Sequence, residues 1–291
     1  MDRSSLSLLI CLLLAGVVAR GETPAEAAQA MVAAEKKFCQ TGQEQGTRAA
    51  FLAFLSGDSI VFSPGPVNGQ EAWSKRPETG LDLTWEPTFA AMARSADFGY
   101  DTGPAKWRAK KTEQKFSGYG YFISIWKKQK DSSWKVALDC GSETPEPAGK
   151  PESLRTANNQ ESKTRNEPEA AHKKLQEAQQ KFMESAKVDS GRAALAVAPD
   201  DIRVYRNGHF AAVGLAAGGG LLTAQDRKLI TEALGGDMSH SGDLAYTYGK
   251  YSTVEVDAIE QGHYLQIWQT DAAGAWRLVL DWQQPLPPAT K

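Results

Sequence analysis

The sequence has little net charge, few cysteines and no long apolar run after its first twenty residues. Lys and Arg total 33 and Asp and Glu total 35, which leaves a formal net charge of −2 in 291 residues. A nucleic-acid-binding protein normally shows a clustered basic excess, so this balance argues against nucleic acid as a partner. Hydrophobic residues at 41 % and charged residues at 23 % are typical of a globular protein. At roughly 150 residues per domain, the length favours two domains.

Residues 1–21 have the pattern of a secretory signal peptide. Arg3 supplies a positive charge, and Leu6 to Val18 form an apolar run of 13 residues. Ala19 and Gly21 place small residues at the −3 and −1 positions of a cleavage site. The run is shorter than the roughly 20 residues that span a bilayer, although an uncleaved N-terminal anchor is the alternative. We therefore expect an exported protein, periplasmic or extracellular, without a membrane span after cleavage.

Blocks of sequence recur at a distance of one domain length. Gly120 to Asp139 and Gly262 to Asp281 share the spacing Gly…Trp…Trp…Asp at an offset of 142. A segment beginning at Ser95 recurs at Ser241, an offset of 146, and the first helical segment recurs at an offset of 144. Matching blocks in the same order predict a tandem repeat of a whole domain.

A polar segment separates the two copies. Residues 141–168 are rich in Pro, Gly, Ser, Glu, Asn and Lys, and Leu154 is their one large aliphatic residue. Such a segment cannot bury a core, so we expect a flexible linker between domains at 22–140 and 169–291. A linker of this length reaches roughly 30 Å, which would let the copies pair as an intramolecular pseudo-dimer.

Each copy begins with helical periodicity and continues with strand-like runs. Apolar residues recur at helical spacing over 24–40 and 169–187, and shorter helices are expected over 47–55 and 191–198. In the first copy, strands are expected over 59–63, 81–87, 97–102, 119–127 and 134–139. Helices gathered at one end of antiparallel strands indicate an α+β fold.

The first copy resembles the SnoaL-like, nuclear transport factor 2-like superfamily. The residues that carry the resemblance are Asp58–Gly69, Ala96–Tyr100, Gly120–Trp126 and Trp134–Asp139. The likeness is to exported proteins of the type called domain of unknown function 4440, here in two tandem copies. It implies two cone-shaped domains, each a curved, mostly antiparallel sheet wrapped around N-terminal helices. The second copy departs at Gly214–Gly236, where we interpret the run Gly218–Gly220 as a flexible loop.

The acid–base residues of ketosteroid-isomerase-like members of this superfamily are missing. Those members carry a catalytic Asp just before a Pro on the first strand, where this chain has Ser63 or, in the second copy, Arg206. They also carry a Tyr on the first helix, where this chain has Phe38 or Cys39 and, in the second copy, Phe182 or Met183. Neither a hydroxyl nor a guanidinium is an effective general base at neutral pH, so the catalytic residues are left unassigned. Without His or Cys pairs at ligand spacing, we expect no metal and no cofactor.

Six side chains are candidates for lining a ligand cavity. They are Tyr100, Thr102, Tyr121, Tyr246, Tyr248 and His263. Alternation along the strands places the tyrosines of each copy on an aromatic face, and such a wall suits an apolar ligand with one or two polar atoms.

Asp139 and Asp281 end the last predicted strand of each copy. Asp139 alternates away from Trp134, Val136 and Leu138, which look like the core face. Aspartates at strand ends usually serve turns or bind backbone N–H groups, so we interpret both residues as structural.

Two cysteines remain after signal cleavage, in a compartment that permits disulfides. Cys39 corresponds to Met183 and Cys140 to Trp282, and both second-copy residues are bulky and apolar. Contact between these two would bring the cysteines of the first copy together. We therefore predict a disulfide between Cys39 and Cys140, tying the first helix to the last strand.

Three functions remain open at this point. The leading hypothesis is an exported, non-catalytic protein that binds a small apolar ligand or acts as a scaffold. One alternative is a lyase, isomerase or hydrolase with chemistry in one cavity, and another is a protein-interaction module of the cell envelope. The superfamily includes both enzymes and binding modules, so the fold alone does not choose among them.

Overall fold

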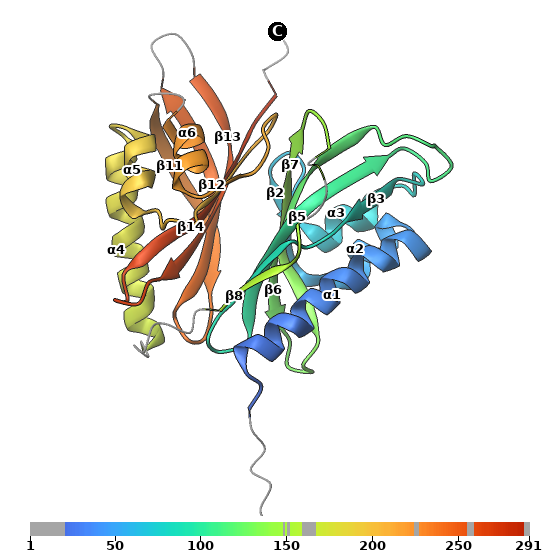
Figure 1. The fold of residues 1–291 in the computed structure, drawn as a ribbon, viewed down its shortest axis with the longest axis horizontal. Coiled ribbons are helices and arrows are strands. Elements are labelled where there is room, and N and C mark those ends of the chain that lie inside the picture. The colour runs from blue at the N-terminus through green and yellow to red at the C-terminus, as the bar shows by residue number, and fades with distance from the viewer. Residues whose placement is uncertain are drawn as a thin grey trace, which may run out of the picture.

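Two β-sheets face each other, and helices cover the outer side of each sheet (Figure 1). This computed structural model describes residues 21–147, 149, 152–158, 167–223, 227–254 and 259–287, so the predicted signal peptide lies outside it except for Gly21. The fold is α+β, as predicted, with two mixed sheets. Within the described residues, no helix is long and apolar enough to cross a membrane.

The first domain contains the helices α1 (Pro24–Gln45), α2 (Thr47–Phe54) and α3 (Gly69–Lys75). Its strands are β1 (Leu55–Phe62), β2 (Pro66–Asn68), β3 (Asp82–Trp85), β4 (Phe89–Met92), β5 (Phe98–Arg108), β6 (Gly118–Lys128), β7 (Trp134–Thr144) and β8 (Arg155–Asn158). The strand order is β2-β1-β7-β6-β5-β4-β8, and β3 pairs with β5. β1 runs parallel to β7, while β5, β6 and β7 form an antiparallel meander.

The second domain repeats this arrangement with fewer strands. Its helices are α4 (Pro168–Ala186), α5 (Ser190–Val197) and α6 (Leu215–Thr223). Its strands are β9 (Arg203–Arg206), β10 (Ala212–Val213), β11 (Lys228–Met238), β12 (Leu244–Val254), β13 (Ile259–Thr270) and β14 (Trp276–Pro285). The order is β10-β9-β14-β13-β12-β11, and β9 runs parallel to β14 as β1 does to β7.

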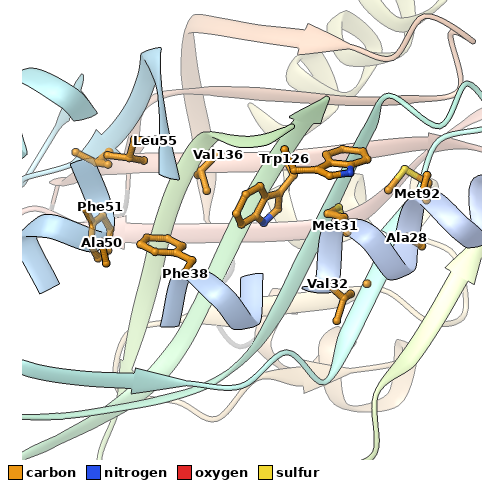
Figure 2. Packing of buried hydrophobic residues seen from close by; sticks show 14 of the residues in the cluster. Ala28, Met31, Val32, Phe38, Ala50, Phe51, Leu55, Met92, Trp126 and Val136 are labelled. Carbon is orange, nitrogen blue, oxygen red and sulfur yellow. The ribbon is translucent and has the colours of Figure 1, made fainter. Parts of the chain in front are cut away.

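Helix α1 is positioned by its first residues and by its apolar face. Thr23 and Glu26 form a reciprocal capping box, and Pro24 suits the first turn. Met31 and Phe38, at helical spacing, are buried against the sheet. Figure 2 shows Phe38 and Trp126 of β6 in this core cluster. The helix therefore presents one face to the concave side of the sheet.

Two segments predicted as loops contain regular structure. Strand β8, inside the predicted linker 141–168, pairs in parallel with β4, and residues 141–144 complete β7. Backbone pairing needs no large apolar side chains, so composition could not reveal this strand. The run Gly218–Gly220 lies within α6 rather than in a loop. A Cβ on Gly218 would lie 3.2 Å from methyl groups of Ile202 and Val204, so glycine lets α6 approach β9 closely.

Apolar side chains of both sheets form one shared cluster between the domains. Phe98 of β5 stacks on Tyr246 of β12 with ring centroids 6.0 Å apart. Trp282 Nε1 donates a hydrogen bond of 2.9 Å to the carbonyl oxygen of Gly141. Each sheet is therefore covered by its own helices on one face and by the other domain on the opposite face.

Polar contacts at the edge of this interface are reciprocal. Arg94 pairs with Asp243 at 3.0 Å. Their counterparts at the offset of 146, His240 and Asp97, contact each other at 2.6 Å. The hydroxyls of Ser95 and Ser241 meet between them at 2.8 Å. Equivalent residues thus exchange partners, which is the pattern of a two-fold interface.

Candidate functional site

A row of polar side chains crosses the helix-facing side of the first sheet. Asp101 of β5 pairs in register with Ser124 of β6, which pairs with Asp139 of β7. Above this row, α1 places Glu35 on the same buried face as Met31 and Phe38. Glu35, Asp101 and Ser124 are fully buried, and Asp139 is half-buried. Three carboxyl groups therefore share the interior of the first domain.

A β-bulge decides the direction of Asp139. The register of β6 and β7 shifts between the pairs Ile125–Leu138 and Trp126–Val136, so one residue of β7 is extra. Val136 packs in the cluster beneath the helices, whereas Leu138 packs in the cluster between the domains. Asp139 then returns to the helix side. The interpretation that it points away from the core assumed unbroken alternation, and the bulge makes that interpretation wrong.

Two indole groups hold Glu35 in place. Trp85 Nε1 donates to one carboxyl oxygen of Glu35, and Trp126 Nε1 donates to the other at 2.9 Å. Trp126 Nε1 also lies 3.2 Å from Asp101 Oδ1. Buried tryptophan N–H groups need acceptors, and these carboxyl oxygens supply them.

Glu35 and Asp101 are buried carboxyl groups whose charges interact. Burial raises the pKa of both groups, and for Asp101 the neighbouring Glu35 raises it further through charge and a hydrogen bond. Hydrogen bonds from Asp101, Trp85 and Trp126 stabilise the charged form of Glu35 and limit its rise. Two buried carboxylates this close cannot both ionise cheaply, so a charged Glu35 disfavours ionisation of Asp101.

Asp139 is the member of the group that reaches a cavity. Burial raises its pKa to about 8, the charge of Glu35 adds to the rise, and a hydrogen bond from Ser124 opposes it. The Ser124 Oγ to Asp139 Oδ2 distance is 3.0 Å. With that pKa, Asp139 is mostly protonated at neutral pH and able both to donate and to accept a proton.

Asp139 lines a cavity of about 270 Å³. Apolar side chains such as Phe51, Leu83 and Phe122 share its lining with polar side chains of Arg76, Ser142, Glu143, Asn207 and Gln284. A narrow pocket of about 40 Å³, which shares Phe51, Leu83 and Phe122 with it, is also lined by Asp139. The volume lies just below the ~300–1,000 Å³ of pockets for drug-sized molecules, so the site suits a small ligand.

A larger hollow than this cavity lies elsewhere in the first domain. It measures about 600 Å³ beside β3 and is lined by charges of both signs, including Asp82, Glu86, Lys106 and Arg108. Asp82 and Arg108 already pair with each other at 2.7 Å. None of the three clustered carboxyl groups lines this hollow, so the chemistry points to the smaller cavity.

The second domain replaces the titratable cluster with neutral groups. Thr247 and Gln266 occupy the register of Asp101 and Ser124, and Gln179 replaces Glu35 at the helix offset of 144. Gln179 Nε2 donates to Thr247 Oγ1 at 2.5 Å, which reproduces the first domain's contact without charge. The second domain has a cavity of about 350 Å³, but its Asp281 is paired with Arg206. Candidate acid–base chemistry therefore belongs to the first domain.

No protein-family model matches the sequence, and no curated protein matches it, but solved structures do. A ketosteroid isomerase-like protein from Erwinia carotovora atroseptica is 15 % identical, with 39 % of this chain and 95 % of that chain covered and a TM-score of 0.35. A protein of unknown function from Pseudomonas putida, described as NTF2-like, is 12 % identical, with 43 % and 100 % covered and a TM-score of 0.35. The epoxide hydrolase/cyclase-like enzyme SalBIII is 8 % identical, with 40 % and 92 % covered and a TM-score of 0.33.

Two of the similar structures, from Pseudomonas putida and Shewanella oneidensis, are described as NTF2-like proteins of unknown function. This is the resemblance that the sequence indicated. In the superfamily's ketosteroid-isomerase-like members the residue before the first-strand proline is a catalytic Asp; here Ser63 Oγ instead lies 3.2 Å from Arg76 Nη2. The buried carboxyl groups of this chain come from α1, β5 and β7 instead.

The six predicted lining residues lie mainly between the domains. Tyr100 and Tyr246 belong to the shared cluster, and Thr102 Oγ1 lies 3.0 Å from the hydroxyl of Tyr205. Tyr248 and His263 lie next to Phe62, with ring centroids 6.3 Å and 6.0 Å away. Tyr121 packs on Tyr205 and also lines the 270 Å³ cavity. Alternation along the strands predicts which side chains share a face of the sheet. Because both faces are buried, it could not show which face lies under the helices.

The predicted disulfide is absent, and Cys39 and Cys140 are free, buried thiols. The bulge that turns Asp139 inward turns Cys140 toward the other domain, where it joins the shared cluster. Cys39 remains on the helix side, where its sulfur accepts from Trp85 N at 3.4 Å. The two thiols therefore lie on opposite faces of the sheet. No group of three or more His, Cys, Asp or Glu side chains is placed to hold a metal within the described part of the chain.

Proposed function

We propose that the first domain binds a small, largely apolar molecule in its cone, with Asp139 as its polar partner. The observation that carries this proposal is the cavity of about 270 Å³ whose lining brings apolar side chains together with the half-buried carboxyl group of Asp139. Apolar side chains combined with a few convergent polar groups are typical of ligand sites. A protonated Asp139 donates a hydrogen bond to a carbonyl or hydroxyl oxygen of the ligand.

The proposal extends to an exported protein in which the two domains form an intramolecular pseudo-dimer. The pattern of residues 1–21 supports export. The shared cluster and the reciprocal pairs Arg94–Asp243 and Asp97–His240 support internal pairing. In this arrangement the second domain covers the face of the first sheet opposite its helices and stabilises the ligand-binding domain.

Binding of a neutral bicyclic probe, naphthol, tests the cavity. The wild-type chain is titrated with naphthol, alongside Ala105→Trp, which fills the cavity, and Ala109→Trp, which adds the same ring at an exposed position. We expect saturable binding to the wild type and to Ala109→Trp, and none to a folded Ala105→Trp. Equal binding to all three variants, or to none, would overturn the proposed site.

Acid–base catalysis in the same cavity is the second candidate function. A carboxyl with a pKa of about 8, beside the buried carboxyl groups of Glu35 and Asp101, is suited to accept and return a proton at neutral pH. Lyases, isomerases and hydrolases are enzyme classes that use general acid–base groups of this kind. Native mass spectrometry of protein purified from its source would identify a bound molecule. That molecule is then incubated with the wild-type protein in D₂O. Deuterium uptake or conversion that is lost in Asp139→Asn supports catalysis, and an unchanged molecule supports binding alone.

A further inference from the structure

The mouth of the cavity contains a cation that forms no ion pair. Arg76 follows α3 and lines the cavity. Its guanidinium lies 4.2 Å from the centroid of the Trp73 ring, and Nη2 donates to Ser63 Oγ at 3.2 Å. Arg94 and Arg108 each pair with a buried carboxylate, whereas within the described residues Arg76 has none. Its positive charge is therefore available to a ligand.

The guanidinium of Arg76 is held in advance of binding. Stacking on an aromatic ring and one hydrogen bond fix its plane, and most of its five N–H donors remain for another acceptor. An arginine held in this way matches the two oxygens of a carboxylate, because both partners are planar and the hydrogen bonds are charge-assisted. The immobilisation also reduces the entropy lost on binding.

The second domain supplies part of the same mouth. Asn207 and Gln284 line the cavity together with residues of β7. Asn207 Oδ1 accepts from Glu143 N at 3.1 Å, and Gly208 N donates to Glu143 O at 2.9 Å. These contacts fix the turn after β9 against the end of β7. The cavity wall is therefore incomplete in the first domain alone.

Charge differs between the two ends of the cavity. The inner end is Asp139, beside the buried Glu35 and Asp101, and it disfavours an additional negative charge. The outer end has the cation Arg76, and the other acidic lining residue there, Glu143, has an exposed side chain. Water screens an exposed carboxylate, so the field at the mouth is set mainly by the half-buried guanidinium.

We propose that the cavity takes the anion of a small apolar carboxylic acid, with its carboxylate on Arg76 and its apolar body directed toward Asp139, and that Asn207 and Gln284 complete the mouth. This inference rests on the proposed function, because it assigns a ligand class to the same cavity. It adds a charged anchor and a contribution from the second domain.

Two probes of equal shape separate the inference from the function on which it rests. Naphthol and naphthoate, substituted at the same ring position, are titrated against the full chain at neutral pH, where the first is neutral and the second is an anion. We expect naphthoate to bind about tenfold more tightly, and Arg76→Gln to remove about that advantage while naphthol binding stays within about twofold. Lys75→Gln is the matched control, since Lys75 is exposed and pairs with Glu71. It should leave both affinities unchanged.

A second pair of variants tests the contribution of the other domain. Gln284→Glu places a negative charge at the mouth and should weaken naphthoate but not naphthol, whereas Gln180→Glu, exposed on α4, should weaken neither. If naphthol binds while naphthoate has no Arg76-dependent advantage, the carboxylate inference is wrong and the proposed function stands. If neither probe binds the wild type, both are wrong. If Arg76→Gln acts as expected but Gln284→Glu has no effect, the contribution of the second domain is wrong.

Discussion

Asp139 and Asp281 occupy the same register in their two sheets, but Asp281 is paired with Arg206 and Asp139 is bonded to Ser124. Val61 and Val204 are the neighbours of these aspartates on the parallel strand, so Ser63 is the counterpart of Arg206. The first domain thus has a hydroxyl where the second has a guanidinium. The absence of a cation at that position leaves the rise in the Asp139 pKa uncompensated.

Transferring the cation should ionise Asp139. In Ser63→Arg we expect the pKa of Asp139 to fall by several units from about 8, because an adjacent guanidinium favours the carboxylate. Carbon-13 NMR titration of the aspartate carboxyl groups measures the change, with Ser63→Ala as the variant that removes the hydroxyl without adding charge. An Asp139 pKa that stays near its wild-type value in Ser63→Arg would show that burial alone sets it.

Asp139 should make the wild type less stable as pH rises. Its pKa is 3.8 in a model peptide and about 8 when folded, so the folded state binds the proton more tightly. The resulting stabilisation is complete below the unfolded value and is lost as pH rises to about 8. Its slope is at most about 1.4 kcal/mol per pH unit. Asp139→Asn lacks this group, so urea unfolding should show a gain for the variant over wild type that grows between pH 5 and pH 8. Parallel stability curves for the two proteins would contradict the assignment.

The buried ion pair between the domains should matter more than the exposed one. Asp243 is fully buried and accepts from Arg94 and from Ser239 Oγ at 2.9 Å. Removing one partner of a buried pair costs about 3–5 kcal/mol, so Asp243→Ala should lower the free energy of unfolding by that order. Lys127→Ala, which breaks the exposed pair with Asp237, should cost about 1 kcal/mol or less. Equal losses in urea unfolding would mean that the domains do not pair as described.

Both cysteines should react as free thiols, and only after unfolding. Cys39 and Cys140 are buried, and burial raises the pKa of each thiol. For a chain that begins at residue 22, and so lacks Cys11, we expect no alkylation by iodoacetamide in native buffer and two adducts in denaturant without a reductant, read by intact-protein mass spectrometry. A protein that stays unmodified in denaturant until a reductant is added would restore the predicted disulfide.

Much of the architecture could be predicted from local patterns. The spacing of Met31 and Phe38 indicates the helix, and the block from Gly120 to Asp139 indicates the final strand pair. These features follow from periodicity and turns, which act over a few residues. Glu35 also carried a local signal that was missed, since it lies at i+4 from Met31 on the apolar helix face. A carboxyl at such a position must find buried partners.

The tertiary structure alone decided which residues form the site. Both faces of the first sheet are apolar and buried, so alternation separated Tyr100 from Asp101 without showing which one faces the cone. The bulge beside Leu138 exchanges the faces of the sheet on which Asp139 and Cys140 lie. It therefore separates Cys140 from Cys39 and places Asp139 beside the other buried carboxyl groups. The amino-acid sequence by itself determined the order of elements and the residue types within reach, because these depend on neighbours along the chain. The pKa of Asp139 depends on contacts between α1, β5, β6 and β7, and only the folded chain brings those together.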